Sequence, residues 1–269
     1  MRVGWLSTGR DQAACNLLAD VVARGQQDDL PLEIAAVFCD REPGEAPESD
    51  RFLELVERLD FPPVTLSSAA SWKAAQALGA DRAAWRNEYH RGVMDLLAPY
   101  RLGLLVMAGY MLIVSPAMCR RYALLNLHPA LPSGPTGTWQ DVIWRLLEEE
   151  AAETGAMVHL ATAELDRGPV VSYFRLAIQG GDWAALWAQF RAKRKTMSVA
   201  EIAAAEGEDE PLFAEIRCCG EAREIPLLYQ TLRHFSEGHL NTSRGAVFAD
   251  AARLPLDLTK PVAAEVARR

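Results

Sequence analysis

Two kinds of hydrophobic pattern alternate along the chain as far as residue 150. Short apolar stretches rich in Val, Ile and Leu predict strands, and longer stretches whose apolar residues recur every three to four positions predict helices. The strands are expected at residues 3–6, 32–38, 63–66, 102–107 and 124–127, and helices at 17–22, 50–59, 81–97 and 138–150. This alternation predicts an α/β fold, a mostly parallel sheet with helices on both faces.

The pattern changes after residue 150. Two strand-like stretches, 156–162 and 169–178, are separated by only six residues, which suits neighbouring strands joined by a loop. Helical patterns follow, and the segment after Thr242 has weak periodicity and two spaced prolines, Pro255 and Pro261. We therefore divide the chain into an α/β core (1–180), a helical insertion (181–215), a C-terminal helix of the core (216–245) and an extended tail (246–269).

Composition narrows the range of functions. The chain has 269 residues and a net charge of −8, which argues against a nucleic-acid or membrane-surface binder but allows a phosphorylated small molecule. The basic stretch 191–195 is interpreted as a solvated helix face. Five cysteines without a C-x-x-C pair indicate neither a disulfide framework nor a zinc site, so no metal is expected. Neither a signal peptide nor a membrane-spanning stretch is recognisable, which predicts a soluble cytoplasmic protein.

The first strand-to-helix loop, residues 7–16, is a candidate ligand site because open α/β sheets bind ligands beyond the carboxyl ends of their strands. Its sequence, STGRDQAACN, matches neither a dinucleotide fingerprint nor a Walker A loop. The helix N-terminus could hold an anion on its backbone N–H groups. The alternative is an ordinary helix start capped by Asp11, and the loop by itself favours that alternative.

Asn126 and His128 form the second candidate site. They lie two positions apart on a predicted strand, so their side chains point the same way, and Pro129 ends the strand directly afterwards. An amide donor beside a histidine suits the stabilisation of an oxyanion. A histidine satisfied in the core is the alternative, and it would be favoured for an isolated N-x-H-P sequence.

Asp166 is the third candidate, because the following Gly168-Pro169 pair forces a tight turn that could fix a carboxylate in place. Near His128, this carboxylate would orient the imidazole. An Asx turn bonded to its own backbone is an equally good interpretation of the segment. His159, inside an apolar strand, is interpreted as a structural or supporting histidine and not as a catalyst.

Taken together, three segments resemble the formyltransferase family, and within it the phosphoribosylglycinamide formyltransferases. They are MAGYMLIVSP (107–116), NLHP (126–129), and GAMVHL through ELDRGPVV (155–171), in the family's order. The resemblance implies a Rossmann-like formyltransferase fold with a helical C-terminal extension. It also implies transfer of a formyl group from 10-formyltetrahydrofolate to a small-molecule amine, by default glycinamide ribonucleotide in purine biosynthesis.

Carried over by position, the resemblance assigns roles to individual residues. Asn126, His128 and Asp166 fall on the catalytic positions. Residues that would bind the folate are Met111, Leu112, Val114, Leu160, Thr162 and Leu165. Residues that would bind the amine substrate are Thr8, Gly9, Asn16 and Glu221. No metal is implied, and a monomer or a homodimer is expected.

The sequence also departs from the family pattern. The loop 8–16 keeps only the final Asn16 of the family's phosphate loop, Leu112 replaces a common Arg, and an extra helical stretch covers 183–213. Other functions therefore stay open: formyl transfer to another amine such as a sugar nucleotide or a biosynthetic intermediate, hydrolysis as in formyltetrahydrofolate deformylase, or a non-catalytic Rossmann-like binding module. Methionyl-tRNA is a weaker acceptor candidate because a basic second domain is not evident.

Overall fold

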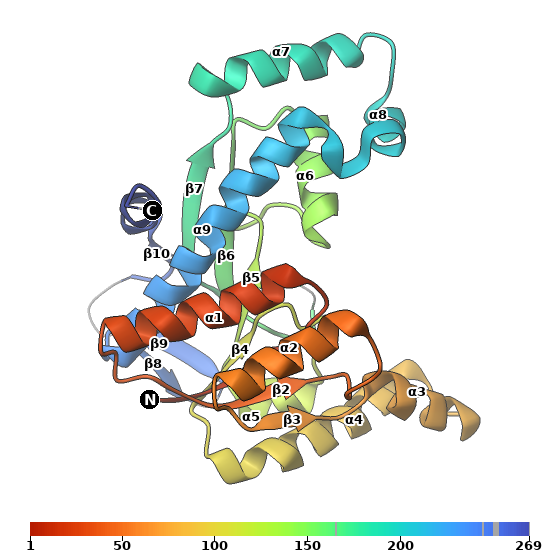
Figure 1. The fold of residues 1–269 in the computed structure, drawn as a ribbon, viewed down its shortest axis with the longest axis vertical. Helices are drawn as coiled ribbons and strands as arrows, with labels where there is room; N and C mark the ends of the chain where they lie inside the picture. Colours follow the sequence, from red (N-terminus) through yellow and green to blue (C-terminus); the bar gives the residue numbers. More distant parts are fainter. Residues whose placement is uncertain (165, 244, 250–252, 269) are drawn as a thin grey trace. The chain divides into compact units, whose positions relative to one another are not determined.

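The computed structural model describes residues 1–164, 166–243, 245–249 and 253–268. An eight-stranded sheet has the order β10-β7-β6-β5-β4-β1-β2-β3, and β8 and β9 form a separate antiparallel pair (Figure 1). The strands are β1 Arg2–Ser7, β2 Glu33–Cys39, β3 Pro63–Thr65, β4 Leu104–Met107, β5 Leu124–His128, β6 Glu153–Leu160, β7 Val170–Ala177, β8 Leu240–Ser243, β9 Ala246–Ala249 and β10 Leu256–Asp257. The helices are α1 Gln12–Gln27, α2 Pro47–Arg58, α3 Ser68–Ala77, α4 Arg82–Leu97, α5 Pro116–Arg121, α6 Trp139–Glu148, α7 Ala184–Lys193, α8 Val199–Glu206, α9 Pro211–Ser236 and α10 Thr259–Val266.

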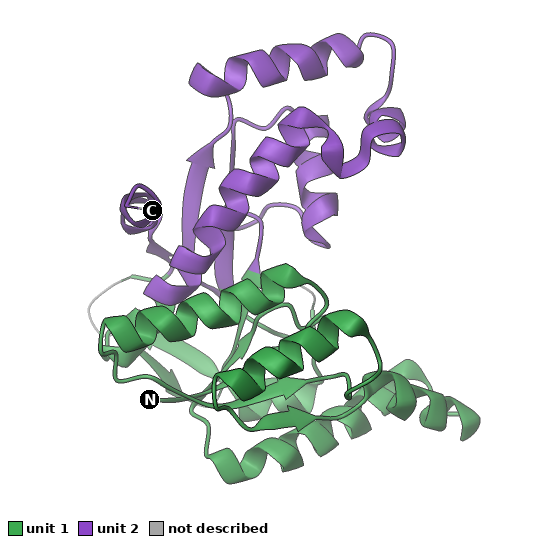
Figure 2. Cartoon of the chain, in the orientation of Figure 1, with its two compact units in different colours: residues 1–127, 159–169, 231–254 green, residues 128–158, 170–230, 255–269 purple. Residues whose placement is uncertain are grey.

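The chain divides into two compact units, which are coloured separately in Figure 2. Each unit is built from segments that are distant in the sequence. Unit 1 contains Met1–Leu127, His159–Pro169 and Thr231–Leu254, and unit 2 contains His128–Val158, Val170–Gln230 and Pro255–Arg269.

Unit 1 is built on parallel strands. β1 pairs with β2 and β4, β2 with β3, and β4 with β5, all in parallel. Parallel strands place their carboxyl ends at one edge, so the loops after these strands share that edge. Alternate side chains of a strand point to opposite faces, and one set packs against α4 and α5. Helices α1 and α2 contact each other and lie in front of the strands of this unit in Figure 1.

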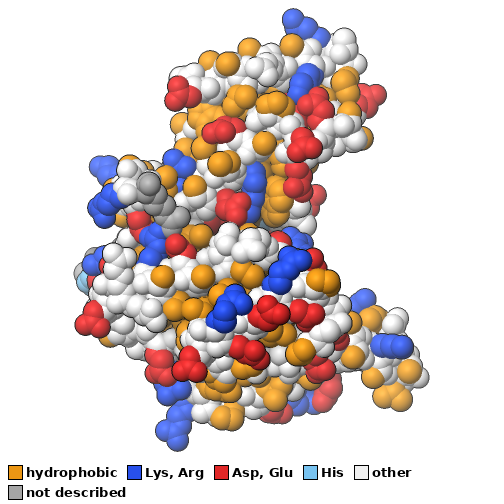
Figure 3. Space-filling view, viewed as in Figure 1, with side chains coloured by type: hydrophobic (Ala, Val, Ile, Leu, Met, Phe, Trp, Pro, Cys, Tyr) orange, Lys and Arg blue, Asp and Glu red, His pale blue; other side chains and the backbone are white. Residues whose placement is uncertain are grey.

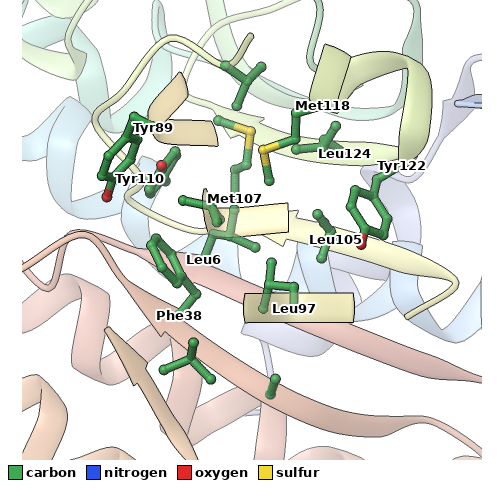
Figure 4. Close-up of a cluster of buried hydrophobic side chains, with 14 of the residues drawn as sticks. Leu6, Phe38, Tyr89, Leu97, Leu105, Met107, Tyr110, Met118, Tyr122 and Leu124 are labelled. Carbon is green, nitrogen blue, oxygen red and sulfur yellow. The ribbon is translucent and has the colours of Figure 1, made fainter. Parts of the chain in front are cut away.

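The core beneath α4 and α5 is a continuous apolar cluster (Figure 4). Leu6, Phe38 and Leu105 come from the strands and are fully buried, and Leu97 and Met118 reach them from the two helices. Burying a side chain of this size contributes about 1.5–3 kcal/mol. The cluster therefore fixes the strands whose carboxyl ends carry the loops described below.

Unit 2 has its own core, centred on Trp187, Phe190 and Phe213 from α7 and α9, all buried. The start of α9 is fixed by Glu210, whose carboxylate accepts a hydrogen bond from the N–H of Phe213 at 2.8 Å. Glu210 is fully buried and forms an ion pair with Lys193 at 3.0 Å. A buried carboxylate of this kind is retained only where such partners compensate its lost hydration.

The predicted α/β fold with a mostly parallel sheet, helices on both faces and a helical C-terminal part is confirmed. Helix α3 escaped prediction because alanines lie on all its sides and its inner face, with Trp72 and Ala75, is only half-buried, and α5 has only six residues. The prediction of an extended segment over 246–269 is wrong for Thr259–Val266, which form α10. Pro261 stands in the first turn of that helix, where the N–H that proline lacks has no intrahelical partner.

Within the described ranges, no helix combines the length and the apolar character needed to cross a membrane. Acidic and basic side chains are interspersed on the face drawn in Figure 3.

Candidate functional site

The carboxyl end of β5 presents Asn126, and the loop 161–169 is anchored beside it. Asn126 is partly exposed and is the register partner of Met107 in β4. The loop is fixed at its start, where Ala161 N–H donates to the carbonyl of Leu124 at 2.7 Å. It is fixed at its end, where the carbonyl of Pro169 accepts from Leu160 N–H at 2.9 Å. The first of these hydrogen bonds joins the loop to β5, and the second closes the loop onto the end of β6.

Backbone conformation in this loop positions Asp166. Its φ is 52°, in the left-handed region that aspartate tolerates better than most residues. Two residues later, a Cβ on Gly168 would lie 1.7 Å from the carbonyl oxygen of Leu160. Only glycine allows this close return of the chain, so the Gly168-Pro169 pair noticed in the sequence is a physical requirement of the turn.

The structure brings Asn126, His159 and Asp166 together within unit 1. The Nδ2 amide of Asn126 lies 3.1 Å from Nε2 of His159 and 3.4 Å from Oδ1 of Asp166. The same Oδ1 is 3.7 Å from His159 Nε2, and the His159 and Asp166 side chains are only 2% and 6% exposed. Two residues predicted to be catalytic are thus neighbours, although 40 positions separate them in the sequence.

The hydrogen-bond partners fix the orientation of these groups. His159 Nδ1 lies 3.0 Å from the carbonyl of Leu160, which can only accept, so Nδ1 carries the hydrogen. In the neutral ring Nε2 is then an acceptor, and Asn126 donates to it. Because Asp166 Oδ1 also accepts, Asn126 directs its NH₂ group toward both partners and its carboxamide oxygen away from them. His159 therefore orients Asn126, the supporting role expected for it.

His128 ends β5, two positions after Asn126, and belongs to unit 2. It is buried, with 3% of its surface exposed, and its Nε2 lies 2.9 Å from the carbonyl oxygen of Pro135. Since that carbonyl only accepts, Nε2 carries the hydrogen. The contact fixes the ring plane.

The segment after β4 holds three of the residues expected to bind folate. Met111 is 50% exposed, Leu112 packs partly against the core of unit 1, and Val114 is buried. Ile113 is also exposed. An exposed apolar surface on an anchored backbone suits a flat aromatic ligand.

The remaining expected folate contacts lie at the end of β6 and in the loop that follows. Leu160 is buried, and the Thr162 hydroxyl donates to the carbonyl of Glu164 at 3.0 Å. Leu165 lies outside the described residues.

The residues expected at the amine-substrate site in the first loop have other partners. Thr8 is buried and its Oγ1 accepts from Met111 N–H at 3.0 Å, so its side chain joins two loops. Gly9 has a φ of 59° and no room for a Cβ beside Phe52. Asn16 is exposed and accepts from Gln12 at 3.0 Å.

Asp11 caps α1, as the loop by itself predicts. Its carboxylate accepts from Ala14 N–H at 3.1 Å. The side chain thereby takes one of the N–H groups that an anion would use at this helix N-terminus.

Glu221, expected to meet the substrate amine, lies on α9 in unit 2. Its carboxylate is 3.4 Å from Arg217, four positions earlier, which also pairs with Glu224 at 2.9 Å. The guanidinium of Arg217 lies over the ring of Trp139, 4.5 Å from its centroid. The i,i+4 spacing was visible in the sequence and indicates such a pair. Across the part of the chain that the structure describes, no cluster of three potential metal ligands occurs.

The comparisons with known proteins point to one family. The formyl transferase family matches residues 15–191. Phosphoribosylglycinamide formyltransferase of Escherichia coli (strain K12) is 36% identical over 172 residues, which cover 63% of this chain and 66% of that protein, just under two thirds of its length.

Solved structures agree on the fold. Glycinamide ribonucleotide transformylase 1 from Symbiobacterium toebii superposes with a TM-score of 0.63, 23% identity and 93% coverage of each chain. A formyltetrahydrofolate deformylase from Pseudomonas syringae pv. tomato gives a TM-score of 0.58 at 20% identity, covering 92% of this chain and 65% of its own. At these identities the structures support the fold alone, whereas the family match covers more than half of the chain. The chain belongs to the formyl transferase family.

Proposed function

We propose that this protein transfers a formyl group from 10-formyltetrahydrofolate to an amine, with glycinamide ribonucleotide as the acceptor. The observation that carries the proposal is the hydrogen-bonded group of Asn126, His159 and Asp166 at the end of β5. It supplies an oriented amide and a nearly buried carboxylate in a chain of the formyl transferase family. The Escherichia coli relative named as the glycinamide ribonucleotide enzyme supports the choice of acceptor.

The reaction needs stabilisation of an anion. The amine attacks the formyl carbon, and the carbonyl oxygen becomes negatively charged in the tetrahedral intermediate. In our proposal the Asn126 N–H that reaches Asp166 only across 3.4 Å donates to this oxygen instead once substrate is bound, and the protonated imidazole of His128 donates to it as well. Asn126 and His128 lie two positions apart on β5, and residues with this spacing on a strand point to the same side.

Asp166 moves the proton in this proposal. The attacking amine loses a proton as the C–N bond forms, and the departing folate nitrogen must gain one as its own C–N bond breaks. The Asp166 carboxylate, through a water, would carry it between them, and the anchored loop 161–169 would keep it beside the reacting group. No change of oxidation state occurs, so atoms and charge balance without a further reactant.

The donor would bind on the segment after β4 and the loop after β6. In this proposal Met111 and Leu112 form the apolar side, with the buried Val114 behind them, and Leu160 and Thr162 contribute on the other. The Met111 side chain is exposed, and a flat heteroaromatic ring lying on it would remove apolar surface from water. Such burial is favourable, so this surface suits the ring of the donor. We place the enzyme in the cytoplasm, where such small-molecule metabolism takes place.

A second acceptor class is favoured by one observation. Asp11 occupies the N-terminus of α1, where a phosphate would otherwise meet free N–H groups and a favourable helix dipole. Its carboxylate, which also pairs with Arg10 at 3.6 Å, already accepts the N–H of Ala14 that a phosphate would use. The alternative proposal is therefore formyl transfer to an amine whose recognition needs no phosphate beside Thr8, Gly9 and Asn16.

An acceptor comparison tests both proposals. Tetrahydrofolate release from 10-formyltetrahydrofolate is followed with glycinamide ribonucleotide, with the dephosphorylated nucleoside, and with no amine. Release only with the ribonucleotide supports the first proposal, and equal release with the nucleoside supports the second. Release without any amine identifies a hydrolase, and no release in any arm contradicts donor use altogether.

A further inference from the structure

Inward-facing and outward-facing side chains alternate along the segment after β4. Tyr110 and Val114 are buried and Leu112 packs partly against the core of unit 1, whereas Met111 and Ile113 are exposed. Apolar contacts have no preferred direction, so the packing of Leu112 and Val114 alone leaves the segment free to shift. Tyr110 differs from these two residues because its buried ring carries a hydroxyl, which can form a directed bond.

The Tyr110 hydroxyl bonds to helix α4 through His90. The phenol oxygen is 3.3 Å from Nε2 of His90, and the two residues are 5% and 1% exposed. His90 Nδ1 lies 2.9 Å from the carbonyl oxygen of Arg86, which can only accept, so Nδ1 carries the hydrogen. Burial lowers the pKa of His90 to about 4, which leaves the ring neutral at pH 7. Nε2 is then an acceptor, and Tyr110 donates to it.

The position of this acceptor is set by α4. Arg86 and His90 lie four positions apart in the helix, whose buried residues also include Trp85 and Val93. A buried phenol hydroxyl has lost its hydration, and the bond to Nε2 compensates that loss. Any conformation of the segment that carries Tyr110 away from His90 leaves both groups without this bond. The pair therefore favours one placement of Tyr110.

That placement determines the direction of Met111, the next residue in the chain. The peptide groups beside Tyr110 are bonded to Thr8, in the loop after β1. Thr8 donates its N–H to the carbonyl of Gly109, and its Oγ1 accepts the N–H of Met111, both at 3.0 Å. Backbone bonds thus hold residues 109 and 111, and the side-chain bond to His90 holds the residue between them.

We propose that His90 is a positioning residue for donor binding: its Nε2 holds the Tyr110 hydroxyl, and this bond keeps the Met111 side chain turned outward for the donor ring. The inference rests on the proposed function. His90 does not touch the donor in this account, since it is buried in α4.

Hydrogen exchange tests the positioning without any ligand. In Tyr110→Phe and in His90→Leu, amide exchange in the peptide covering residues 109–113 should be about tenfold faster, relative to intrinsic rates, than in the parent, because a local constraint worth one hydrogen bond is lost. The double variant should exchange no faster than the faster single variant, since both changes break the same bond. His90→Gln keeps an acceptor near the position of Nε2, and its exchange should stay within about twofold of the parent.

Tyr89→Phe is the matched control. Tyr89 is also buried in the cluster drawn in Figure 4, but its hydroxyl donates to the carbonyl of Leu66 at 2.7 Å. Loss of this hydroxyl should leave both the exchange at 109–113 and the binding of the donor unchanged.

Donor binding supplies the second readout. The Kd for tetrahydrofolate, measured by calorimetric titration, and the KM for 10-formyltetrahydrofolate should each rise about tenfold in Tyr110→Phe and His90→Leu, with kcat within about twofold. His90→Gln should keep both values close to those of the parent. A general loss of packing at α4 would lower stability without separating KM from kcat in this way.

The outcomes separate the two proposals. If the parent neither binds tetrahydrofolate nor uses the donor, the proposed function fails, and exchange at 109–113 still decides whether His90 holds the segment. Parent-like exchange and KM in Tyr110→Phe, which keeps the ring, would overturn the positioning role even if His90→Leu does not fold. Equal effects in Tyr89→Phe, or additive effects in the double variant, would overturn it as well.

Discussion

The side-chain amide of Asn126 donates a hydrogen bond to Nε2 of His159 across 3.1 Å. This bond depends on the His159 tautomer, which the carbonyl of Leu160 sets through Nδ1. A histidine buried in β6 thereby fixes the direction of an amide at the end of β5. One N–H of Asn126 is thereby fixed on His159 before any substrate binds, and in our proposal the other, which lies 3.4 Å from Asp166, serves the oxyanion.

Asp166→Asn should lower kcat by about 10²–10⁴ while the fold is kept, because the amide has the shape of the carboxylate but cannot take a proton. The donor KM should change much less, since Asp166 acts on the proton and the Asn126 contact can persist. Steady-state kinetics with saturating donor measures this. Asp182→Asn, at an exposed position outside the site, is the matched control and should keep the parent kcat. A kcat within tenfold of the parent in Asp166→Asn would contradict its role.

His128→Ala should abolish turnover with an intact fold, because the imidazole donor that we assign to the oxyanion is removed. Its loss also leaves the Pro135 carbonyl without the 2.9 Å partner, so circular dichroism must first establish that the variant is folded. His239→Ala is the control, with a side chain that is 62% exposed. A folded His128→Ala enzyme that retains activity would remove His128 from the mechanism.

The fold was predictable where burial leaves a periodic pattern and unpredictable where it does not. The strands could be located because their side chains are buried, while the inner face of α3 is only half-buried, by Trp72 and Ala75, and gives no clear apolar period. Asn126 and Asp166 could be nominated from short motifs, but their contact depends on how the loop 161–169 returns beside β5.

The sequence also did not show that two polar loop residues, Thr8 and Asp40, are buried. Sequence patterns treat polar loop residues as solvated, and here both are buried by loops that meet at one sheet edge. Which polar residues become buried depends on which distant loops meet in the folded protein. The pattern of residues along the sequence does not give this information. Asp11 was predictable as a helix cap because its partner lies only three positions away.

Glu210→Ala should lower the free energy of unfolding by about 2–4 kcal/mol, because it removes a buried carboxylate that caps α9 and pairs with Lys193. Chemical denaturation at pH 7 measures the loss. Glu57→Ala, at an exposed position of α2, is the control and should change stability by less than about 0.5 kcal/mol. Equal effects of the two substitutions would show that the cap and ion pair contribute nothing.

The buried His90 should lower the free energy of unfolding as the solution becomes acidic. Burial lowers its pKa to about 4 in the folded protein, from an ordinary value of 6.5. Between these values the unfolded chain binds a proton that the folded chain does not, so stability is lost as the pH falls from 6.5 toward 4. At pH 5 this loss is about 2 kcal/mol relative to pH 7.5.

The comparison with His90→Gln isolates this contribution, because glutamine does not titrate and all other histidines are shared. Unfolding free energies of both proteins are measured at pH 7.5 and pH 5. The free energy of unfolding of the parent minus that of His90→Gln should be about 2 kcal/mol smaller at pH 5 than at pH 7.5. The same difference at both pH values would contradict a lowered pKa of His90 as the cause.

The fate of the formyl carbon tests the proposed reaction most directly. The enzyme is incubated with 10-formyltetrahydrofolate labelled with ¹³C in the formyl group and with glycinamide ribonucleotide, and the products are separated by mass. We predict that the label appears on the amine nitrogen of the ribonucleotide, with one tetrahydrofolate released for each label transferred. Label recovered as free formate, or left on the folate while the ribonucleotide stays unmodified, would contradict the account.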